Sequence, residues 1–393
     1  MSDPWLTIVG IGEDGHAGLP DSSREALVQA EIIFGGPRHL ELAGAGDRGR
    51  PWPVPFDIDP VLAERGRKVV VLASGDPFWF GAGTSIAAHV PRGEFRTIPA
   101  PSVFSLVAAH LGWPIQRCIC LGLHAAPFAR MVAYLHPGAA IIATVRDGSA
   151  PAALAAWLVA RGFGTTRIHV LERMGGPRQR VRTCRADAFD LTDIGAPVAV
   201  ALEVAGAPGL MRGFGLADAL FASDGQITKR PVRAITLSTL APRPGELLWD
   251  IGAGSGSISV EWCLAGGRAI AVETREDRVA NIVENAARFG VDDRLRVVTG
   301  RAPEAFKGLD APDAVFIGGG ASHELIADLW SVLSPCARVV VNGVTLETEA
   351  LLAAEHAARG GALMRIDLAE AAPLGRMRGW VAARPVVQWS VVR

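Results

Sequence analysis

Short apolar runs rich in β-branched residues alternate with amphipathic segments along the chain. Apolar runs of about four to eight residues are typical of buried strands, and amphipathic segments of helices. Strands joined through helices usually pair in parallel, so the pattern predicts an α/β fold with parallel sheets covered on both faces. The predicted strands form two series, residues 6–11, 68–74, 139–145, 166–172 and 197–204, then residues 247–253, 269–274, 295–300, 313–319 and 337–343.

A Gly-rich segment, residues 205–225, separates the two series. Segments of this composition commonly join domains. The chain has 393 residues, and a prior of about 150 residues per domain favours two domains. We predict domains at residues 1–209 and 210–393, with a short helix over residues 216–221 near the start of the second.

The composition narrows the class of protein. Apolar residues make up 49% of the chain and charged residues 20%, with a formal net charge of −1. This supports large cores and excludes a mostly disordered chain or a broad basic surface for nucleic acid. No apolar run reaches the roughly 18 residues that span a bilayer. The five cysteines include no CxxC pair, which indicates reduced thiols. We expect a cytoplasmic protein that binds neither nucleic acid nor membranes.

The strongest motif is LLWDIGAGSGSISVEW, residues 247–262. An apolar strand runs into glycines at 252, 254 and 256 and then into a helix. Such glycines let the backbone approach a bound ligand closely. The next predicted strand ends in Glu273, placed to accept both hydroxyls of a ribose. The alternative is an ordinary strand-to-helix turn in which glycine serves packing.

The GxGxG spacing differs from the GxGxxG of dinucleotide-binding loops. With an acid before the first glycine, it resembles the loop of class I S-adenosylmethionine (SAM) methyltransferases. The resemblance implies a Rossmann-like domain with a mostly parallel seven-stranded sheet. Residues 300–306 would form a turn and a Pro-initiated helix, and residues 364–393 two strands around a long loop, the last reversed. The implied cofactor-binding residues are Gly252, Ala253, Gly254, Ser255, Gly256, Glu273 and the backbone of Ala302.

The segments around this loop indicate a substrate. SDGQITK (223–229), IGGG (317–320), VNGVTLETE (341–349) and PLGRMRGW (373–380) resemble the decarboxylating precorrin methyltransferase domain of corrin (vitamin B12) biosynthesis. This implies that DGQITK closes over the SAM site with Thr228 beside the cofactor. Alternatively, Asp224 and Thr228 cap the start of a helix.

The N-terminal half carries a second resemblance. TIVGIGEDG (7–15), VVLASGDPFWFGAG (70–83), PAPSVFSLVAAHLGWP (99–114) and VLERMGGPRQRV (170–181) resemble the tetrapyrrole methylase superfamily (class III). This implies a two-lobed domain whose SGDP turn, residues 74–77, bends SAM between the lobes. The implied cofactor-binding residues are Gly75, Asp76, Pro77, Ser102 and Thr144.

Two of these assignments have alternatives. Asp76 faces the ligand or caps the helix after it, and Ser102 lines the pocket or is the N-cap of a helix over 103–111.

Together the resemblances imply a fusion enzyme. It would methylate precorrin-6B at C5 (N-terminal domain) and C15 (C-terminal domain) and decarboxylate the ring C acetate, giving precorrin-8X. They also imply two SAM sites per chain, no metal and a homo-oligomer. The alternatives are another corrinoid or a porphyrinogen as substrate, an RNA or protein methyltransferase, or a non-catalytic SAM sensor.

The chemistry requires few catalytic groups. A meso carbon is already nucleophilic, so the enzyme mainly aligns it with the methyl donor at about 3–3.5 Å, and the macrocycle is itself an electron sink for decarboxylation. Glu347 is our candidate general acid or base, unless it is solvated on the following helix. Asn342 either hydrogen-bonds to the ring or satisfies backbone hydrogen-bonding groups at a strand end. Lys229 is a further candidate catalytic residue.

Cations should bind the substrate carboxylates. We name Arg233, Arg376 and Arg378, although a single arginine is more often a surface charge than a ligand. Trp380 packs on the macrocycle or within the protein.

Overall fold

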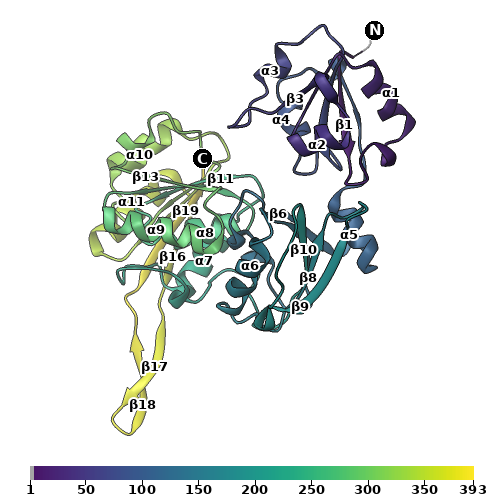
Figure 1. The fold of residues 1–393 in the computed structure, drawn as a ribbon. Coiled ribbons are helices and arrows are strands. Elements are labelled where there is room, and N and C mark those ends of the chain that lie inside the picture. Colours follow the sequence, from purple (N-terminus) through teal and green to yellow (C-terminus); the bar gives the residue numbers. More distant parts are fainter. Residues whose placement is uncertain (1–3) are drawn as a thin grey trace. The chain divides into compact units, whose positions relative to one another are not determined.

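The computed structural model describes residues 4–393 and divides the chain into two compact units (Figure 1). The first unit runs to residue 128 and continues over 134–208, and the second holds 129–133 and 209–393. None of the helices in the described part of the chain has the length and hydropathy of a membrane span.

The first unit begins with a parallel five-stranded sheet of order β3-β2-β4-β1-β5. Every residue of β1 is buried, as expected for a central strand covered on both faces. The strands are β1 (Leu6–Ile11), β2 (Ile32–Gly35), β3 (Gly49–Pro51), β4 (Val69–Ser74) and β5 (Phe95–Ile98), and the helices are α1 (Asp21–Gln29), α2 (Pro37–Leu42), α3 (Asp59–Leu62) and α4 (Gly83–Ala87).

A second five-stranded sheet completes this unit, in the order β6-β7-β10-β8-β9. Only β6 and β7 are parallel, and the other pairs are antiparallel. The expectation of parallel sheets throughout is therefore wrong here, because β10 inserts between β7 and β8 and β9 returns directly beside β8. The elements are α5 (Val103–Leu111), β6 (Cys118–Gly122), β7 (Ala140–Thr144), α6 (Ala150–Val159), β8 (Arg167–Glu172), β9 (Arg180–Arg185) and β10 (Val198–Glu203).

The second unit contains the predicted seven-stranded, mostly parallel sheet, in the order β13-β12-β11-β14-β15-β19-β16. Strands β11 to β15 are parallel, and β19 is antiparallel to both β15 and β16. The sheet is formed by β11 (Leu247–Ile251), β12 (Arg268–Glu273), β13 (Leu295–Thr299), β14 (Ala314–Ile317), β15 (Arg338–Gly343), β16 (Ala362–Ile366) and β19 (Val386–Val392). The helices are α7 (Arg230–Leu240), α8 (Ser257–Leu264), α9 (Glu276–Phe289), α10 (His323–Val332) and α11 (Leu346–Arg359).

Two predicted helices are shorter than expected. The helix over 216–221 is a single 3-10 turn, Asp218–Leu220. The backbone groups of Leu216, just before this turn, form hydrogen bonds with side chains. Leu216 N–H donates to Glu261, and Leu216 C=O accepts from Arg233. The Pro-initiated helix after β13 is also one 3-10 turn, Glu304–Phe306.

The long loop expected within residues 364–393 is instead a β-hairpin, β17 (Ala369–Leu374) and β18 (Met377–Ala382). Leu374 pairs with Met377, so Gly375 and Arg376 form a two-residue turn, and Gly375 has the positive φ of +60° that such turns require. In Figure 1 this ribbon, drawn in yellow, extends away from the sheet of the second unit.

Candidate cofactor sites

The glycine loop of the second unit lies between β11 and α8, at the carboxyl edge of the sheet. Gly252 N–H and Ala253 N–H both donate to Val272 C=O, which ties the loop to β12. Gly254 has φ +58°, and the nearest atom to a Cβ built there is Gln226 O at 3.4 Å. The loop therefore keeps open space at its tip, under the segment that contains Gln226.

Glu273 ends β12 and is only 5% exposed. Its Oε2 accepts a hydrogen bond from Gly254 N–H at 2.9 Å, and its Oε1 accepts from Thr274 N–H at 2.8 Å and Arg275 N–H at 3.1 Å. The structure thus brings the predicted ribose-binding acid to the glycine loop. In the structure, however, the carboxylate binds backbone N–H groups of the loop and of its own strand end.

A second buried acid lies behind the loop. Asp250 is 1% exposed, and its Oδ2 accepts from Ser259 Oγ at 2.6 Å and Ser259 N–H at 3.2 Å. Burial raises the pKa of Asp250 to about 6, and the charge of Glu273 adds to the rise while the Ser259 hydrogen bonds oppose it. Among residues 4–393, Asp250 Oδ1 and the buried Ser255 Oγ have no hydrogen-bond partner. The open tip at Gly254, the acid at Glu273 and the unpaired Ser255 hydroxyl fit a polar ligand such as SAM.

The predicted cover of this site, residues 224–229, is fixed to α9. Asp224 Oδ2 accepts from Arg278 Nε at 3.0 Å, and Asp224 also pairs with Arg275 at 3.5 Å. A hydrogen bond from Gln226 N–H, and then Arg278, lower the pKa of Asp224. Helix α7 starts at Arg230 with Lys229 as its N-cap and no side-chain cap. The alternative that Asp224 or Thr228 caps this helix is therefore wrong.

Arg233 is not at the surface, which corrects its assignment as a substrate ligand. It is 0% exposed, and its Nε lies 2.6 Å from Glu261 Oε1. Its Nη1 contacts Asp218 Oδ1 at 2.9 Å and Thr228 O at 2.5 Å, and its Nη2 donates to Leu216 O. These protein acceptors occupy the guanidinium, so Arg233 serves to hold the segment before α7 against α8.

Asn342, at the end of β15, also bonds to side chains of the protein. Its Nδ2 donates to Thr236 Oγ1 at 2.9 Å, and its Oδ1 accepts from Gln388 Nε2 at 2.9 Å. Thr236 and Gln388 are buried. The sequence predicted two alternative roles for Asn342, a bond to the ring or bonds to backbone at the strand end. Neither described this network, because its members come from α7, β15 and β19.

Most of the remaining candidates of the second unit are exposed, and Ala302 is half-buried. Glu347 is in the first turn of α11, after the N-cap Thr345, and Lys229 is the exposed N-cap of α7. Arg376, Arg378 and Trp380 lie on the β17–β18 hairpin, where Trp380 is 78% exposed and does not pack in the core of its own chain. Ala302 follows β13, close to Gly300, whose N–H donates to Glu273 O at 3.0 Å.

In the first unit, the SGDP turn follows β4 at the carboxyl edge of the first sheet. Gly75 has φ +56°, and a Cβ built there would lie 2.8 Å from Ser102 Cα, so the turn packs directly on the start of α5. Asp76 Oδ1 accepts from Phe78 N–H at 2.9 Å, which closes an Asx turn. Helix α4 begins only at Gly83, so the helix-capping interpretation of Asp76 is wrong.

The other two candidates of this unit take defined positions. Ser102 is the N-cap of α5, with its Oγ accepting from Ser105 N–H at 3.2 Å, which confirms the capping alternative. Thr144 ends β7 with its Oγ1 3.3 Å from His124 Nδ1. Its register partner Gly122 contacts Phe80, shortly after the SGDP turn. The ends of β4 and of β6 and β7 are thereby linked.

Sequence reasoning missed a polar cluster beside this turn. Arg38 and His39 follow β2 and contact Ser74, the first residue of the turn, and Glu13, after β1, pairs with Arg38. The signal that could have found it is the pair Arg38–His39 directly after the apolar run IIFG, at a strand end.

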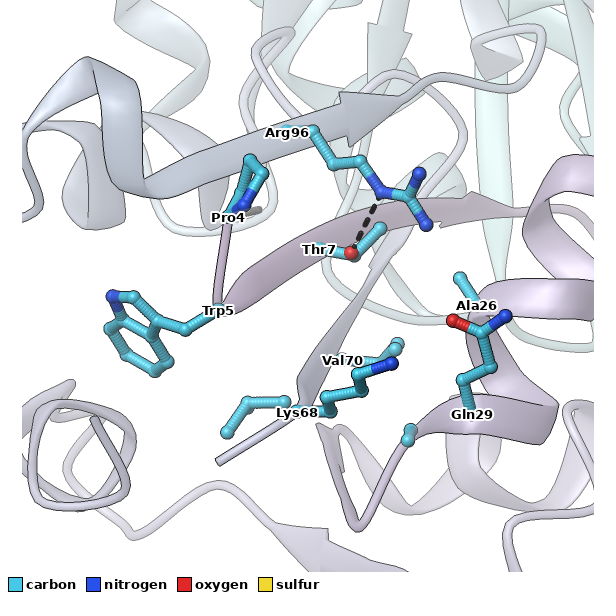
Figure 2. Close-up of a pocket in the computed structure, with 10 residues that line it drawn as sticks. Pro4, Trp5, Thr7, Ala26, Gln29, Lys68, Val70 and Arg96 are labelled. Atoms are coloured by element: carbon cyan, nitrogen blue, oxygen red, sulfur yellow. Dashed lines mark hydrogen bonds between the residues drawn. The ribbon is translucent and has the colours of Figure 1, made fainter. Parts of the chain in front are cut away.

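Figure 2 shows a small cavity in the first unit at the amino ends of β1 and β4. Thr7, Lys68 and Arg96 line it, and Thr7 Oγ1 accepts from Arg96 Nε at 3.1 Å. Its volume of about 120 Å³ is below the roughly 300–1,000 Å³ of small-molecule sites. Open α/β sheets bind ligands at the opposite, carboxyl edge, so this cavity is not the cofactor site.

Within residues 4–393, no three His, Cys, Asp or Glu side chains are grouped so that they could hold a metal ion. The five cysteines are free.

Comparison with known proteins identifies the family. The tetrapyrrole (corrin/porphyrin) methylase family matches residues 6–190, and the precorrin methyltransferase domain family matches residues 219–393. A Sinorhizobium protein named precorrin-6Y C(5,15)-methyltransferase (decarboxylating) is 48% identical over 397 residues, covering 98% of this chain and 96% of its own. The chain belongs to the precorrin-6Y C5,15-methyltransferase (decarboxylating) family. Both predicted resemblances are confirmed, and the chain is a member of a SAM-dependent methyltransferase family.

The precorrin-6Y methyltransferase family also has shorter relatives whose names carry one activity. A probable cobalt-precorrin-6B C(15)-methyltransferase (decarboxylating) from Saccharolobus solfataricus is 35% identical, and the match covers 34% of this chain and 71% of the relative. A cobalt-precorrin-7 C(5)-methyltransferase from Salmonella typhimurium is 31% identical, covering 45% of this chain and 88% of the relative.

Proposed function

We propose that this chain methylates precorrin-6B at C5 and C15 and removes the ring C acetate carboxylate as CO2, giving precorrin-8X. The first unit carries C5 methylation, and the second carries C15 methylation with decarboxylation. Support comes from the full-length Sinorhizobium relative and from the shorter relatives, each named for one of these activities. The division of the chain into two compact units agrees with two separable activities.

The observation that carries this proposal is that each unit has its own strand-end loop suited to SAM. In the second unit it is the loop whose Gly254 N–H is held by Glu273. In the first unit it is the turn whose Gly75 packs on Ser102. We therefore propose two SAM sites per chain.

When bound, SAM supplies a methyl group already activated by its sulfonium. What this chain contributes is binding and alignment, because holding the reacting carbons in line at about 3–3.5 Å supplies much of the acceleration. The glycine loop and residues 224–229 fix the donor side in the second unit, and the SGDP turn does so in the first. The conjugated macrocycle accepts the electron pair left by CO2, so no protein nucleophile is needed.

The β17–β18 hairpin supports the further proposal of a homo-oligomer. It forms a two-stranded sheet of its own, and such ribbons are marginally stable alone. Met377 is 76% exposed and Trp380 78% exposed. We propose that a second copy of the chain covers these side chains. Light scattering should then show a smaller particle for the variant with Met377→Ser and Trp380→Ser, whereas a wild-type monomer would contradict the proposal.

The function is tested by incubating the protein with SAM and precorrin-6B and following the product mass, with calorimetry to count SAM sites. We expect two methyl groups gained, one CO2 lost and two SAM sites per chain. An unchanged substrate mass in a preparation that binds SAM would exclude precorrin-6B and favour another corrinoid or a porphyrinogen.

A further inference from the structure

Four side chains from three segments, the turn after β1, helix α2 and the end of β4, meet at the carboxyl edge of the first sheet. Glu13 follows β1, Arg38 and His39 follow the end of β2, and Ser74 ends β4 immediately before Gly75. Strands β2, β4 and β1 are adjacent and parallel, so their carboxyl ends lie together. We call Glu13, Arg38, His39 and Ser74 the Ser74 cluster.

The contacts within the cluster converge on the serine hydroxyl. Arg38 Nη2 lies 3.2 Å from Ser74 Oγ and 2.8 Å from His39 Nε2, and His39 Nε2 lies 2.8 Å from Ser74 Oγ. Arg38 Nη1 forms an ion pair with Glu13, whose side chain is mostly buried. Glu13 thus fixes Arg38, and Arg38 together with His39 fixes Ser74.

The protonation state of His39 follows from its neighbours. A guanidinium only donates hydrogen bonds, so His39 Nε2 accepts from Arg38 and the neutral ring carries its proton on Nδ1, which is buried and has no hydrogen-bond partner among residues 4–393. Burial and then the charge of Arg38 lower the pKa of His39 to about 4. Around neutral pH, Nε2 is therefore an acceptor that Arg38 Nη2 and the Ser74 hydroxyl share, and the ring is not a competing cation.

The cluster also reaches the second sheet of the unit. A Cβ built on Gly176, in the segment between β8 and β9, would lie 2.6 Å from Glu13 Cβ and 2.8 Å from Glu13 O. Glu13 is therefore in close contact with this segment. Through Glu13, the position of Ser74 depends on both sheets.

Stability alone does not explain this arrangement. Ser74 is exposed, and an exposed hydroxyl can hydrogen-bond to water at little cost. Here a partly buried guanidinium, itself paired with a carboxylate, and a neutral imidazole hold that hydroxyl in one place. Supporting shells of this kind fix the geometry of a functional loop.

We propose that Glu13, Arg38 and His39 are positioning residues that set the SGDP turn through Ser74, and so control SAM binding by the first unit and C5 methylation. The inference rests on the proposed function, in which the first unit has its own SAM site. None of the three residues is assigned to the reacting atoms.

The test measures SAM binding in the full-length Gly254→Arg chain, which should retain only the site of the first unit. His39→Leu and Ser74→Ala should each raise the Kd about tenfold to hundredfold, as expected for loss of a hydrogen bond to a charged group. His39→Gln, whose Oε1 can accept from Arg38, should stay within about threefold of the parent. Arg65→Gln is the matched control, because Arg65 pairs with Glu94 elsewhere in this unit.

Kinetics with the second unit intact distinguish positioning from a general loss of structure. In His39→Leu and Ser74→Ala, the KM for SAM in C5 methylation should rise while kcat at saturating SAM changes less than about threefold. C15 methylation should be unchanged. If His39→Leu does not fold, Ser74→Ala alone tests the positioning role, because this variant only removes an exposed hydroxyl.

Gly75→Val separates this inference from the proposed function. If Gly75→Val abolishes C5 methylation while His39→Leu and Ser74→Ala bind SAM normally, the positioning role is refuted and the proposed function stands. Failure of His39→Gln to restore binding also refutes it. If Gly75→Val leaves C5 methylation intact, the proposed function of the first unit is itself wrong.

Discussion

In the second unit a buried carboxylate holds the glycine loop, whereas in the first unit a guanidinium and a neutral imidazole hold the SGDP turn. Glu273 accepts directly from the loop backbone at Gly254. Arg38 and His39 instead reach the turn through the hydroxyl of Ser74. The two loops share no supporting residue, so a substitution in one site should leave the other intact.

The two sites also differ in how their glycines are packed. A side chain at Gly254 would enter open space beneath Gln226 O, while a side chain at Gly75 would collide with Ser102 Cα. Substitution at Gly254 should therefore block a ligand, and substitution at Gly75 should displace the turn.

The largest effect is expected for Gly254→Arg. The new side chain fills the open tip of the loop and forces a non-glycine residue into φ +58°. We expect C15 methylation and decarboxylation to fall by more than about a thousandfold, while one SAM site per chain remains by calorimetry. Retention of two sites would contradict the assignment of this loop.

Glu273→Ala should weaken SAM binding by the second unit about tenfold to hundredfold, because it removes the acceptor of Gly254 N–H and a group suited to the ribose. Titration in a Gly75→Val background isolates this site. Glu276→Gln, an exposed acid in the first turn of α9, is the matched control. Equal loss in both variants would show that the effect is only one of charge.

Asp250→Asn tests the second unit through the pH dependence of its stability. Burial raises the pKa of Asp250 from 3.8 to about 6. Between these values the folded chain holds a proton that the unfolded chain has released, so this group lowers the free energy of unfolding as the pH rises through that window. Relative to Asp250→Asn, the wild type should lose about 1–3 kcal/mol between pH 4 and 7 in urea titrations. A difference that does not change with pH would contradict the buried, protonated carboxyl.

The smallest effect is expected for Glu347→Gln. Glu347 is exposed in the first turn of α11, which agrees with the alternative that it is a solvated residue of this helix and not a general acid or base. We expect kcat for C15 methylation and decarboxylation to change less than about threefold, whereas loss of an essential general acid or base would cost about a hundredfold or more. A large fall in kcat with unchanged SAM binding would restore Glu347 as a proton-transfer group.

Much of the fold could be predicted because the relevant signals are local. The apolar runs that became β1, β4 and β11 are buried in the centres of their sheets. The helix at 103–111 begins and ends as predicted, since Ser102 caps its start and Gly112 ends it in the left-handed region. The glycine loop was predictable for the same reason.

The errors arise where distant residues decide the local structure. The predicted helix at 216–221 gives way because Glu261 and Arg233 take the backbone groups of Leu216. The Ser74 cluster was missed because its members come from three separate segments, and only the sheet order brings those segments together.

The most direct test of the central claim compares the products that the full-length Gly75→Val and Gly254→Arg variants form from SAM and precorrin-6B or its singly methylated intermediates. We predict that Gly75→Val adds one methyl group, at C15, and releases CO2, and that Gly254→Arg adds one methyl group, at C5, without releasing CO2. If either variant performed both methylations, or if both lost the same step, the assignment of one SAM site and one methylation to each unit would be contradicted.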